Sequence, residues 1–188
     1  MNSIHLHPLC CQPDNTGLLI IDIQEAFRKA VLEFERVAHN AAVLARGFSL
    51  LGLPVLATEQ YPKGLGKTDE RVHRSCTRWN LIEKTCFSCT AAKGFMEKIQ
   101  ALGIENLVVC GIESHVCVNQ TVLGLLQGSY TVHIAVDTMA SRNRADHETA
   151  LRKMEQAGAV PTTTEMCLFE LVKEAGTEQF KQIQKLIK

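Results

Sequence analysis

A chain of 188 residues is long enough for one domain with a sizeable core and short for two. Twenty basic residues balance twenty acidic ones, which argues against binding to nucleic acid or to an anionic membrane surface. The longest apolar runs have the length of strands, so we expect no segment that spans a membrane.

The first 15 residues are predicted to form a short N-terminal arm, and residues 16–188 to form the domain. The arm lacks the basic start and long apolar stretch of a secretory signal. The eight cysteines follow no spacing that is typical of a disulfide scaffold. We therefore expect reduced thiols in an intracellular protein, in the cytoplasm or, as the alternative, in the mitochondrion.

From Thr16 onward, short apolar runs alternate with longer helical stretches. This alternation is typical of an α/β fold, here a three-layer α-β-α sandwich with a mainly parallel, doubly wound sheet. The predicted strands cover residues 17–22, 54–58, 80–85, 106–111, 131–137 and 160–163. The predicted helices cover residues 25–51, 90–102, 114–127, 144–156, 166–173 and 177–187, and residues 59–67 are predicted to be an irregular loop.

Polar residues follow several of these strands. Asp22 ends the first strand, Lys84 ends the third, and Cys117 lies in the first turn of the helix after the fourth. Ligands of parallel sheets bind outside the carboxyl ends of the strands, so we expect these three side chains to converge. A thiol at a helix start is expected to have a lowered pKa, while a carboxylate and an ammonium can serve as base and counter-charge. The alternative is that Cys117 is an ordinary packed core residue.

Two other arrangements carry weaker signals. His115 and Cys117 are two residues apart on a predicted helix, so they point to different faces and are poorly placed as a dyad. Cys86 and Cys89 form a single C-x-x-C pair, which suggests redox chemistry or half a zinc site. Since no second pair follows at zinc spacing, we interpret them as ordinary thiols and predict neither a metal site nor a cofactor.

Several motifs in this order resemble one family. They are Leu19-Ile20-Ile21-Asp22-Ile23-Gln24 with Phe27, Glu83-Lys84-Thr85-Cys86-Phe87-Ser88, Gly111-Ile112-Glu113-Ser114-His115-Val116-Cys117-Val118 with Thr121, and Asp137 with Ser141. From about residue 17 to 172 the chain resembles the isochorismatase-like cysteine hydrolases. It is most similar to their unassigned isochorismatase-domain subgroup, related to nicotinamidases and N-carbamoylsarcosine amidohydrolases. The resemblance implies an isochorismatase-like, Rossmann-like topology.

The resemblance also implies roles for individual residues of these motifs. Asp22 corresponds to the general base, Lys84 to the cation that stabilises the thiolate, and Cys117 to the nucleophile. A cis peptide between Ile112 and Glu113 is expected, with the N–H groups of Glu113 and Cys117 forming an oxyanion hole. The implied reaction is cleavage of a small amide or related C–N bond through a cysteine thioester.

Other expectations concern the substrate and partners. The candidate pocket residues are Gln24, Phe27 and His115, which belong to these motifs, and Glu59 and Tyr61, which follow the second predicted strand. The nicotinamidase Asp-x-His metal motif is replaced by the run at residues 58–62, Thr-Glu-Gln-Tyr-Pro, so we expect a metal-independent hydrolase. Relatives commonly assemble, so we expect a homo-oligomer acting on a small molecule. The alternatives are an oligomeric binding or scaffold protein with a vestigial pocket and a ribonuclease-like activity.

Overall fold

The computed structural model of the chain describes residues 7–76 and 78–188. Its centre is a six-stranded sheet in which every neighbouring pair is parallel, in the order β3-β2-β1-β4-β5-β6. Parallel neighbours require crossover connections, and helices supply them. The strands are β1 (Thr16–Ile21), β2 (Val55–Gln60), β3 (Asn80–Lys84), β4 (Asn106–Ile112), β5 (Thr131–Ala140) and β6 (Val160–Thr162).

The helices vary widely in length. The α-helices are α1 (Phe34–Leu50), α2 (Pro62–Leu65), α3 (Glu70–Arg74), α4 (Phe95–Ala101), α5 (Asn119–Gln127), α6 (Arg144–Gln156), α7 (Thr164–Val172) and α8 (Glu178–Ile187). Two short 3₁₀ helices, η1 (Glu25–Lys29) and η2 (Cys89–Ala91), and a π-helical turn, η3 (Ser114–Val118), complete the connections.

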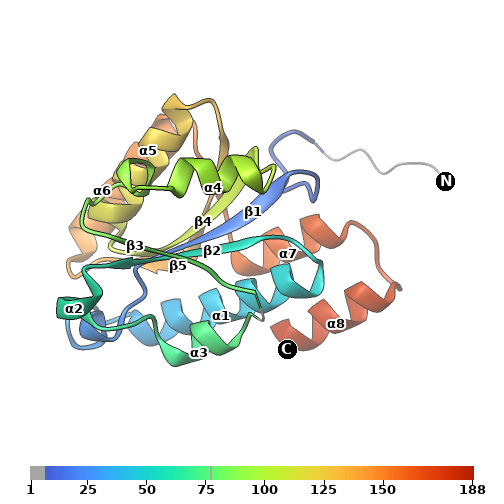
Figure 1. Cartoon of the computed structure of the whole chain (residues 1–188). Coiled ribbons are helices and arrows are strands. Elements are labelled where there is room, and N and C mark those ends of the chain that lie inside the picture. Colours follow the sequence, from blue (N-terminus) through green and yellow to red (C-terminus); the bar gives the residue numbers. More distant parts are fainter. Residues whose placement is uncertain (1–6, 77) are drawn as a thin grey trace.

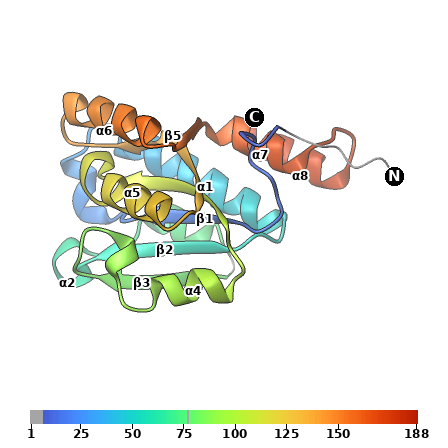
Figure 2. The same ribbon diagram turned by 90° about the horizontal axis from the view of Figure 1, so that it is seen from above.

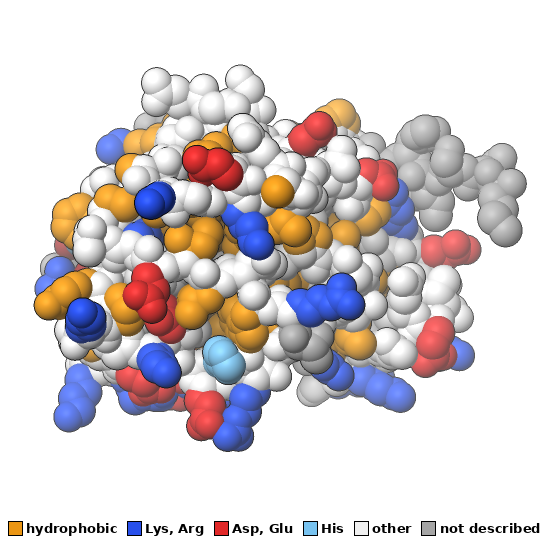
Figure 3. Space-filling view, in the orientation of Figure 1, with side chains coloured by type: hydrophobic (Ala, Val, Ile, Leu, Met, Phe, Trp, Pro, Cys, Tyr) orange, Lys and Arg blue, Asp and Glu red, His pale blue; other side chains and the backbone are white. Residues whose placement is uncertain are grey.

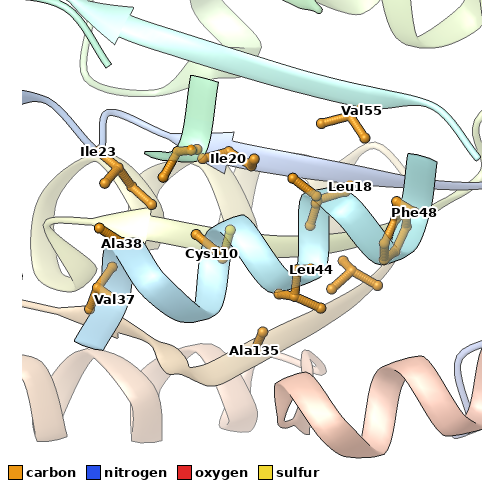
Figure 4. Packing of buried hydrophobic residues seen from close by; sticks show 14 of the residues in the cluster. Leu18, Ile20, Ile23, Val37, Ala38, Leu44, Phe48, Val55, Cys110 and Ala135 are labelled. Atoms are coloured by element: carbon orange, nitrogen blue, oxygen red, sulfur yellow. The ribbon is translucent and has the colours of Figure 1, made fainter. Parts of the chain in front are cut away.

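Helices cover both faces of the sheet (Figures 1 and 2). One face packs against α1, α3, α7 and α8, and the other packs against α4, α5 and α6. Side chains of a strand alternate between the faces, so Leu18 and Ile20 join the α1 cluster while Leu19 and Ile21 join the α4–α5 cluster. Figure 4 shows Leu18 and Ile20 packed beside α1. The three-layer, doubly wound α/β prediction is confirmed, and the sheet is parallel throughout.

The strand order changes direction beside β1. β2 and β3 extend the sheet on one side of β1, whereas β4, β5 and β6 extend it on the other. Such a switch point leaves a crevice outside the carboxyl ends of the strands, where α/β proteins bind ligands. Asp22 directly follows β1, and η3 with Cys117 directly follows β4. The topology therefore places both residues at the switch point.

β1 and β4 approach each other closely at Gly111. Its φ of +133° is one that side-chain-bearing residues rarely adopt, and a Cβ there would lie 2.1 Å from the carbonyl oxygen of Ile21. Only glycine fits this position without backbone movement. The close approach fixes the start of η3 relative to the end of β1.

The predicted helix over residues 25–51 is wrong in one respect. The chain forms η1, leaves the helix, and begins α1 only at Phe34. Val31 and Phe34 are both buried, so the apolar spacing continues across the break although the backbone does not. Periodicity alone could not reveal this interruption.

Other boundaries also differ from the predictions. The expected irregular loop contains α2, which Pro62 begins, and α3 follows it. The expected helix over residues 90–102 is divided by Gly94, whose φ is +80°. The strand expected to end at Asp137 continues to Ala140, because β5 shifts its register against β4 between Val109 and Gly111.

The arm and the surface add two observations. Residues 1–6 of the predicted N-terminal arm lie outside the described residues, but Cys11 is fully buried and its N–H donates to Glu170 Oε2 at 2.7 Å. The described part of the arm thus packs on α7 of its own chain. Acidic and basic side chains are interspersed on the face seen in Figure 3. Among the described helices, none is long and apolar enough to cross a membrane.

Candidate active site

Asp22 is held at the end of β1 by bonds to β2 and β3. Its backbone has a φ of +50°, which aspartate tolerates better than most residues, and its N–H donates to Thr58 O at 3.2 Å. The side chain is fully buried. Oδ1 accepts from Thr58 Oγ1 at 2.7 Å, and Oδ2 accepts from Lys84 Nζ at 2.6 Å. The carboxylate is therefore oriented by two neighbouring strands.

Lys84 is a buried cation whose donors are all used. Its ammonium donates to Asp22 Oδ2 at 2.6 Å, to Gln60 Oε1 at 2.8 Å and to Phe87 O at 3.3 Å. Burial acts to lower the pKa of Lys84, but Asp22 and the thiols of Cys89 and Cys117 outweigh it, so the pKa is raised. The ammonium is therefore charged at neutral pH, and three acceptors compensate its removal from water.

Cys117 faces this ion pair from η3. The residue is 6% exposed, and burial followed by the charge of Asp22 raises the pKa of its thiol, while Lys84 acts in the opposite direction. The lowered pKa predicted from the helix start is therefore wrong, because burial and the carboxylate exceed the effects that favour the thiolate. The resting group is a neutral thiol beside a carboxylate that can accept its proton.

A second thiol shares this buried region. Cys89 Sγ lies 3.8 Å from Thr58 Oγ1, and its backbone N–H donates to Thr121 Oγ1 at 2.9 Å. The Thr121 hydroxyl in turn donates to Cys117 O at 2.7 Å. Burial raises the pKa of Cys89 to about 11. Within residues 7–76 and 78–188, no group of three or more His, Cys, Asp or Glu side chains could hold a metal ion.

The turn over residues 113–118, here called the nucleophile turn, follows a cis peptide bond between Ile112 and Glu113. The N–H groups of Val116 and Val118 donate to Glu113 O at 3.1 and 3.3 Å. The first N–H groups of a helical segment have no acceptor one turn before them, so they can face a ligand. Cys117 is the residue of this turn that faces the Asp22–Lys84 pair.

The structure thus brings Asp22, Lys84 and Cys117 into one buried cluster, although they come from three different segments. Thr58 and Gln60 also belong to it, and no motif in the sequence indicated either of them. β2 lies between β1 and β3, so the last residues of β2 must lie between Asp22 and Lys84. The strand order, once known, would have identified them.

Three of the candidate pocket residues have other contacts. Gln24 is fully buried, and its side chain holds the following loop through Gln60 N at 2.8 Å and Gly66 O at 2.6 Å. Phe27 packs against the α1 core cluster. Glu59 points away from the cluster because Thr58 before it faces Asp22, and its Oε1 accepts from Thr68 N at 2.7 Å.

The other two candidates lie nearer to solvent. Tyr61 is 55% exposed and lines a cavity of about 590 Å³ together with Lys84, Lys63 and Lys93. His115 lies in the nucleophile turn and bonds through Nδ1 to Ser141 Oγ at 3.0 Å.

A second cavity of about 550 Å³ lies between the start of α1 and the start of α6. Leu32, Arg36, Arg142 and His147 are among the residues that line it. Asp137 does not join either region, because its Oδ1 accepts from Thr164 N at 2.9 Å and it therefore holds the start of α7.

Sequence comparison identifies one domain and close relatives. The isochorismatase domain matches residues 16–166. Isochorismatase domain-containing protein 2A of Mus musculus is 37% identical over 177 residues, which cover 94% of this chain and 84% of the relative.

Solved structures are similar over nearly the whole chain. One described as MAR1 ribonuclease from Caenorhabditis elegans is 35% identical, has a TM-score of 0.90, and covers 95% of this chain and 92% of that one. The YcaC gene product from Escherichia coli, described as an octameric hydrolase of unknown specificity, is 18% identical with a TM-score of 0.86. The similarity covers 97% of each chain and shows that the two proteins have the same fold.

Proposed function

The chain belongs to the isochorismatase family, and on this premise we propose that it is a cysteine hydrolase that cleaves a small amide or related C–N bond. The observation that carries the proposal is the buried Asp22–Lys84 pair, at 2.6 Å, whose two charges both act on the Cys117 thiol. A neutral thiol beside a carboxylate is a nucleophile that is activated when its proton is transferred.

The first half-reaction forms a thioester. Asp22 accepts the Cys117 proton as sulfur attacks the substrate carbonyl, and the N–H groups of Glu113 and Cys117 receive the developing oxyanion. The C–N bond breaks, and the proton held by Asp22 passes to the leaving amine. The net charge of the cluster with its substrate does not change, because the negative charge moves from the Asp22 carboxylate to the oxyanion, and the Lys84 ammonium offsets it throughout.

The second half-reaction restores the enzyme. Asp22 accepts a proton from water as the oxygen attacks the thioester carbonyl. The carbon–sulfur bond breaks, the carboxylic acid leaves, and the proton returns to the Cys117 sulfur. Neither half-reaction uses a redox step.

The test combines a panel of small amides with trapping of the intermediate. Wild-type protein turning over its best substrate and quenched in acid should carry the acyl group on Cys117, detected by mass spectrometry of peptides. Asp22→Asn should lower kcat by about 10³-fold, because it keeps the shape of the base but not its function. Hydrolysis that persists in Cys117→Ala would exclude the thioester route.

RNA cleavage is the second candidate function. It is favoured by the 35% identity to the structure described as a MAR1 ribonuclease. The net charge of zero and the interspersed surface charges of Figure 3 favour the small substrate instead. Asp22 could act as base in both reactions, but attack by an RNA hydroxyl needs no thiol.

The same variants separate the two functions. Amide hydrolysis should be lost in both Cys117→Ala and Asp22→Asn. A ribonuclease that uses Asp22 should lose cleavage of a labelled RNA in Asp22→Asn and keep it in Cys117→Ala. RNA cleavage that is unchanged in both variants and disappears on further purification would identify a contaminant.

A binding or scaffold protein with a vestigial site is the third reading. It would be favoured by a Lys84 side chain turned away from Cys117, but the ammonium faces the cluster that contains both Asp22 and Cys117.

We further propose a homo-oligomer, which the octameric state described for YcaC supports. Light scattering at micromolar concentration should give a multiple of 20.8 kDa, and a monomer mass would contradict it.

A further inference from the structure

Three consecutive residues of the nucleophile turn are bonded to one other segment of the chain. Glu113, Ser114 and His115 begin the turn that carries Cys117. Their partners all lie in residues 141–147, here called the anchoring segment, which joins the end of β5 to the first turn of α6. The anchoring segment therefore holds all three residues at the start of the nucleophile turn.

The first contact is an ion pair made by Glu113. This residue occupies the N-cap position of the turn, yet its side chain makes no capping hydrogen bond to it. Instead Oε1 accepts from both the backbone N and the side-chain Nε of Arg142, each at 3.0 Å. Glu113 is 6% exposed, so these charge-assisted bonds compensate a carboxylate removed from water.

The next two contacts pair a serine with a histidine. Ser114 Oγ and His147 Nδ1 lie 2.8 Å apart, and Ser114 is fully buried. His147 is fixed at the start of α6, where its N–H donates to Asn143 O at 3.1 Å. His115 Nδ1 and Ser141 Oγ lie 3.0 Å apart, so each of the three turn residues has its own partner.

We propose that Arg142 and His147 are positioning residues for the hydrolysis proposed above. Through Glu113 and Ser114 they hold the nucleophile turn so that its N–H groups and the Cys117 sulfur meet the substrate carbonyl together. Stabilisation of an oxyanion depends on donors that are already in place, and a shift of about 1 Å can cost about 10²-fold in rate. The anchoring segment supplies that fixed placement.

Loss of a purely structural contact would lower the stability of the protein, whereas loss of a positioning contact should lower kcat. His147→Leu removes the bond to Ser114, whereas His147→Asn keeps a short polar side chain that can bond to the same hydroxyl. Arg142→Ala removes the Nε bond and retains the backbone N–H. Arg144→Ala is the matched control, since Arg144 starts the same helix, is 90% exposed and pairs with Glu148 instead.

The experiment measures kcat and KM for the best amide, together with the rate at which iodoacetamide modifies Cys117. His147→Leu should lower kcat and the alkylation rate by about 10-fold, with KM within twofold. His147→Asn should recover most of the loss, and Arg142→Ala should lose about threefold. Arg144→Ala should match wild type, and all variants should keep the wild-type circular dichroism spectrum.

The inference is overturned if kcat and Cys117 alkylation are unchanged in His147→Leu and Arg142→Ala. It is also overturned if both fall only in proportion to the fraction of unfolded protein. Failure of the proposed function looks different, because activity would then survive in Cys117→Ala. In that event the alkylation rates still decide whether the anchoring segment holds the turn.

Discussion

Two buried thiols, on opposite faces of the sheet, have pKa values that are shifted in opposite directions. Cys117 packs on the α4–α5 face, where burial and Asp22 raise the pKa of its thiol. Cys11 packs on the α1–α7 face, where a hydrogen bond with Cys167 lowers its pKa to about 7, His133 acts in the same direction, and burial opposes both. A lowered pKa alone would therefore select Cys11 as the reactive thiol.

The comparison indicates that a candidate nucleophile is recognised by the groups around its thiol and not by the pKa of the resting thiol alone. Beside Cys117 lie the Asp22 carboxylate and the nucleophile turn, which are the base and the oxyanion donors of the proposed reaction. Beside Cys11 lie a second thiol and the Glu170 carboxylate, which already accepts the Cys11 N–H at 2.7 Å. The first site holds the groups that the proposed hydrolysis needs, and the second joins the N-terminal arm to α7.

The largest expected effect separates the two thiols by activity. Cys117→Ala should reduce turnover of an amide substrate by at least about 10⁴-fold, whereas Cys11→Ala should stay within about twofold. Steady-state assays with both purified variants make the comparison. A large loss in Cys11→Ala with unchanged folding would show that the contrast between the sites is misassigned.

The ion pair gives the next largest effect, on stability. Lys84→Met leaves the Asp22 carboxylate buried without its cation, so the free energy of unfolding should fall by about 3–5 kcal/mol. The double variant Asp22→Asn/Lys84→Met should recover a large part of this loss, because it leaves no unpaired buried charge. Urea unfolding curves provide the measurement, and equal losses in the single and double variants would contradict the argument.

The pH at which the thiolate forms should differ strongly between Cys11 and Cys117. Because burial and the Asp22 carboxylate raise the pKa of Cys117 well above the ordinary range for cysteine, its thiolate should form only at a strongly alkaline pH. The Cys11–Cys167 pair should lose its first proton near pH 7. Ultraviolet thiolate titrations of wild type, Cys117→Ala and Cys11→Ala isolate each step by difference. A Cys117 step near pH 7 would reverse the assignment.

The smallest effect concerns the arm. Glu170→Ala leaves the buried Cys11 N–H without its acceptor, so the free energy of unfolding should fall by about 1–2 kcal/mol with turnover unchanged. Glu174→Ala, at an exposed position after the same helix, is the matched control. Equal stabilities of the two variants would mean that the Cys11 bond to Glu170 contributes nothing measurable.

The sequence predicted the fold well because its signals are local. Buried parallel strands read as continuous apolar runs, and carboxyl ends of such strands share one edge, so the convergence of Asp22, Lys84 and Cys117 followed from their places after strands. Thr58 and Gln60 were missed because their role depends on strand order. Alternation along β2 also explains why Glu59, beside Thr58, faces the other side of the sheet.

The electrostatics could not be predicted in the same way. The pKa of Cys117 depends on its burial and on the distance to a carboxylate 95 positions earlier in the chain, neither of which is written in the local sequence. The helix start favours the thiolate, but burial and the Asp22 carboxylate oppose it more strongly. The contacts between residues 113–115 and 141–147 were missed for the same reason, since they join separate segments.

Lys84 is the last residue of β3, which is an edge strand of the sheet and pairs with β2. An edge strand with one neighbour can detach at a lower free energy than the whole sheet requires. Its partner Asp22 lies 62 residues away, directly after β1, so detachment of β3 removes the ammonium while the central strands stay folded. Heating should therefore inactivate the protein before its helical signal is lost, and activity should return as soon as the edge strand pairs again.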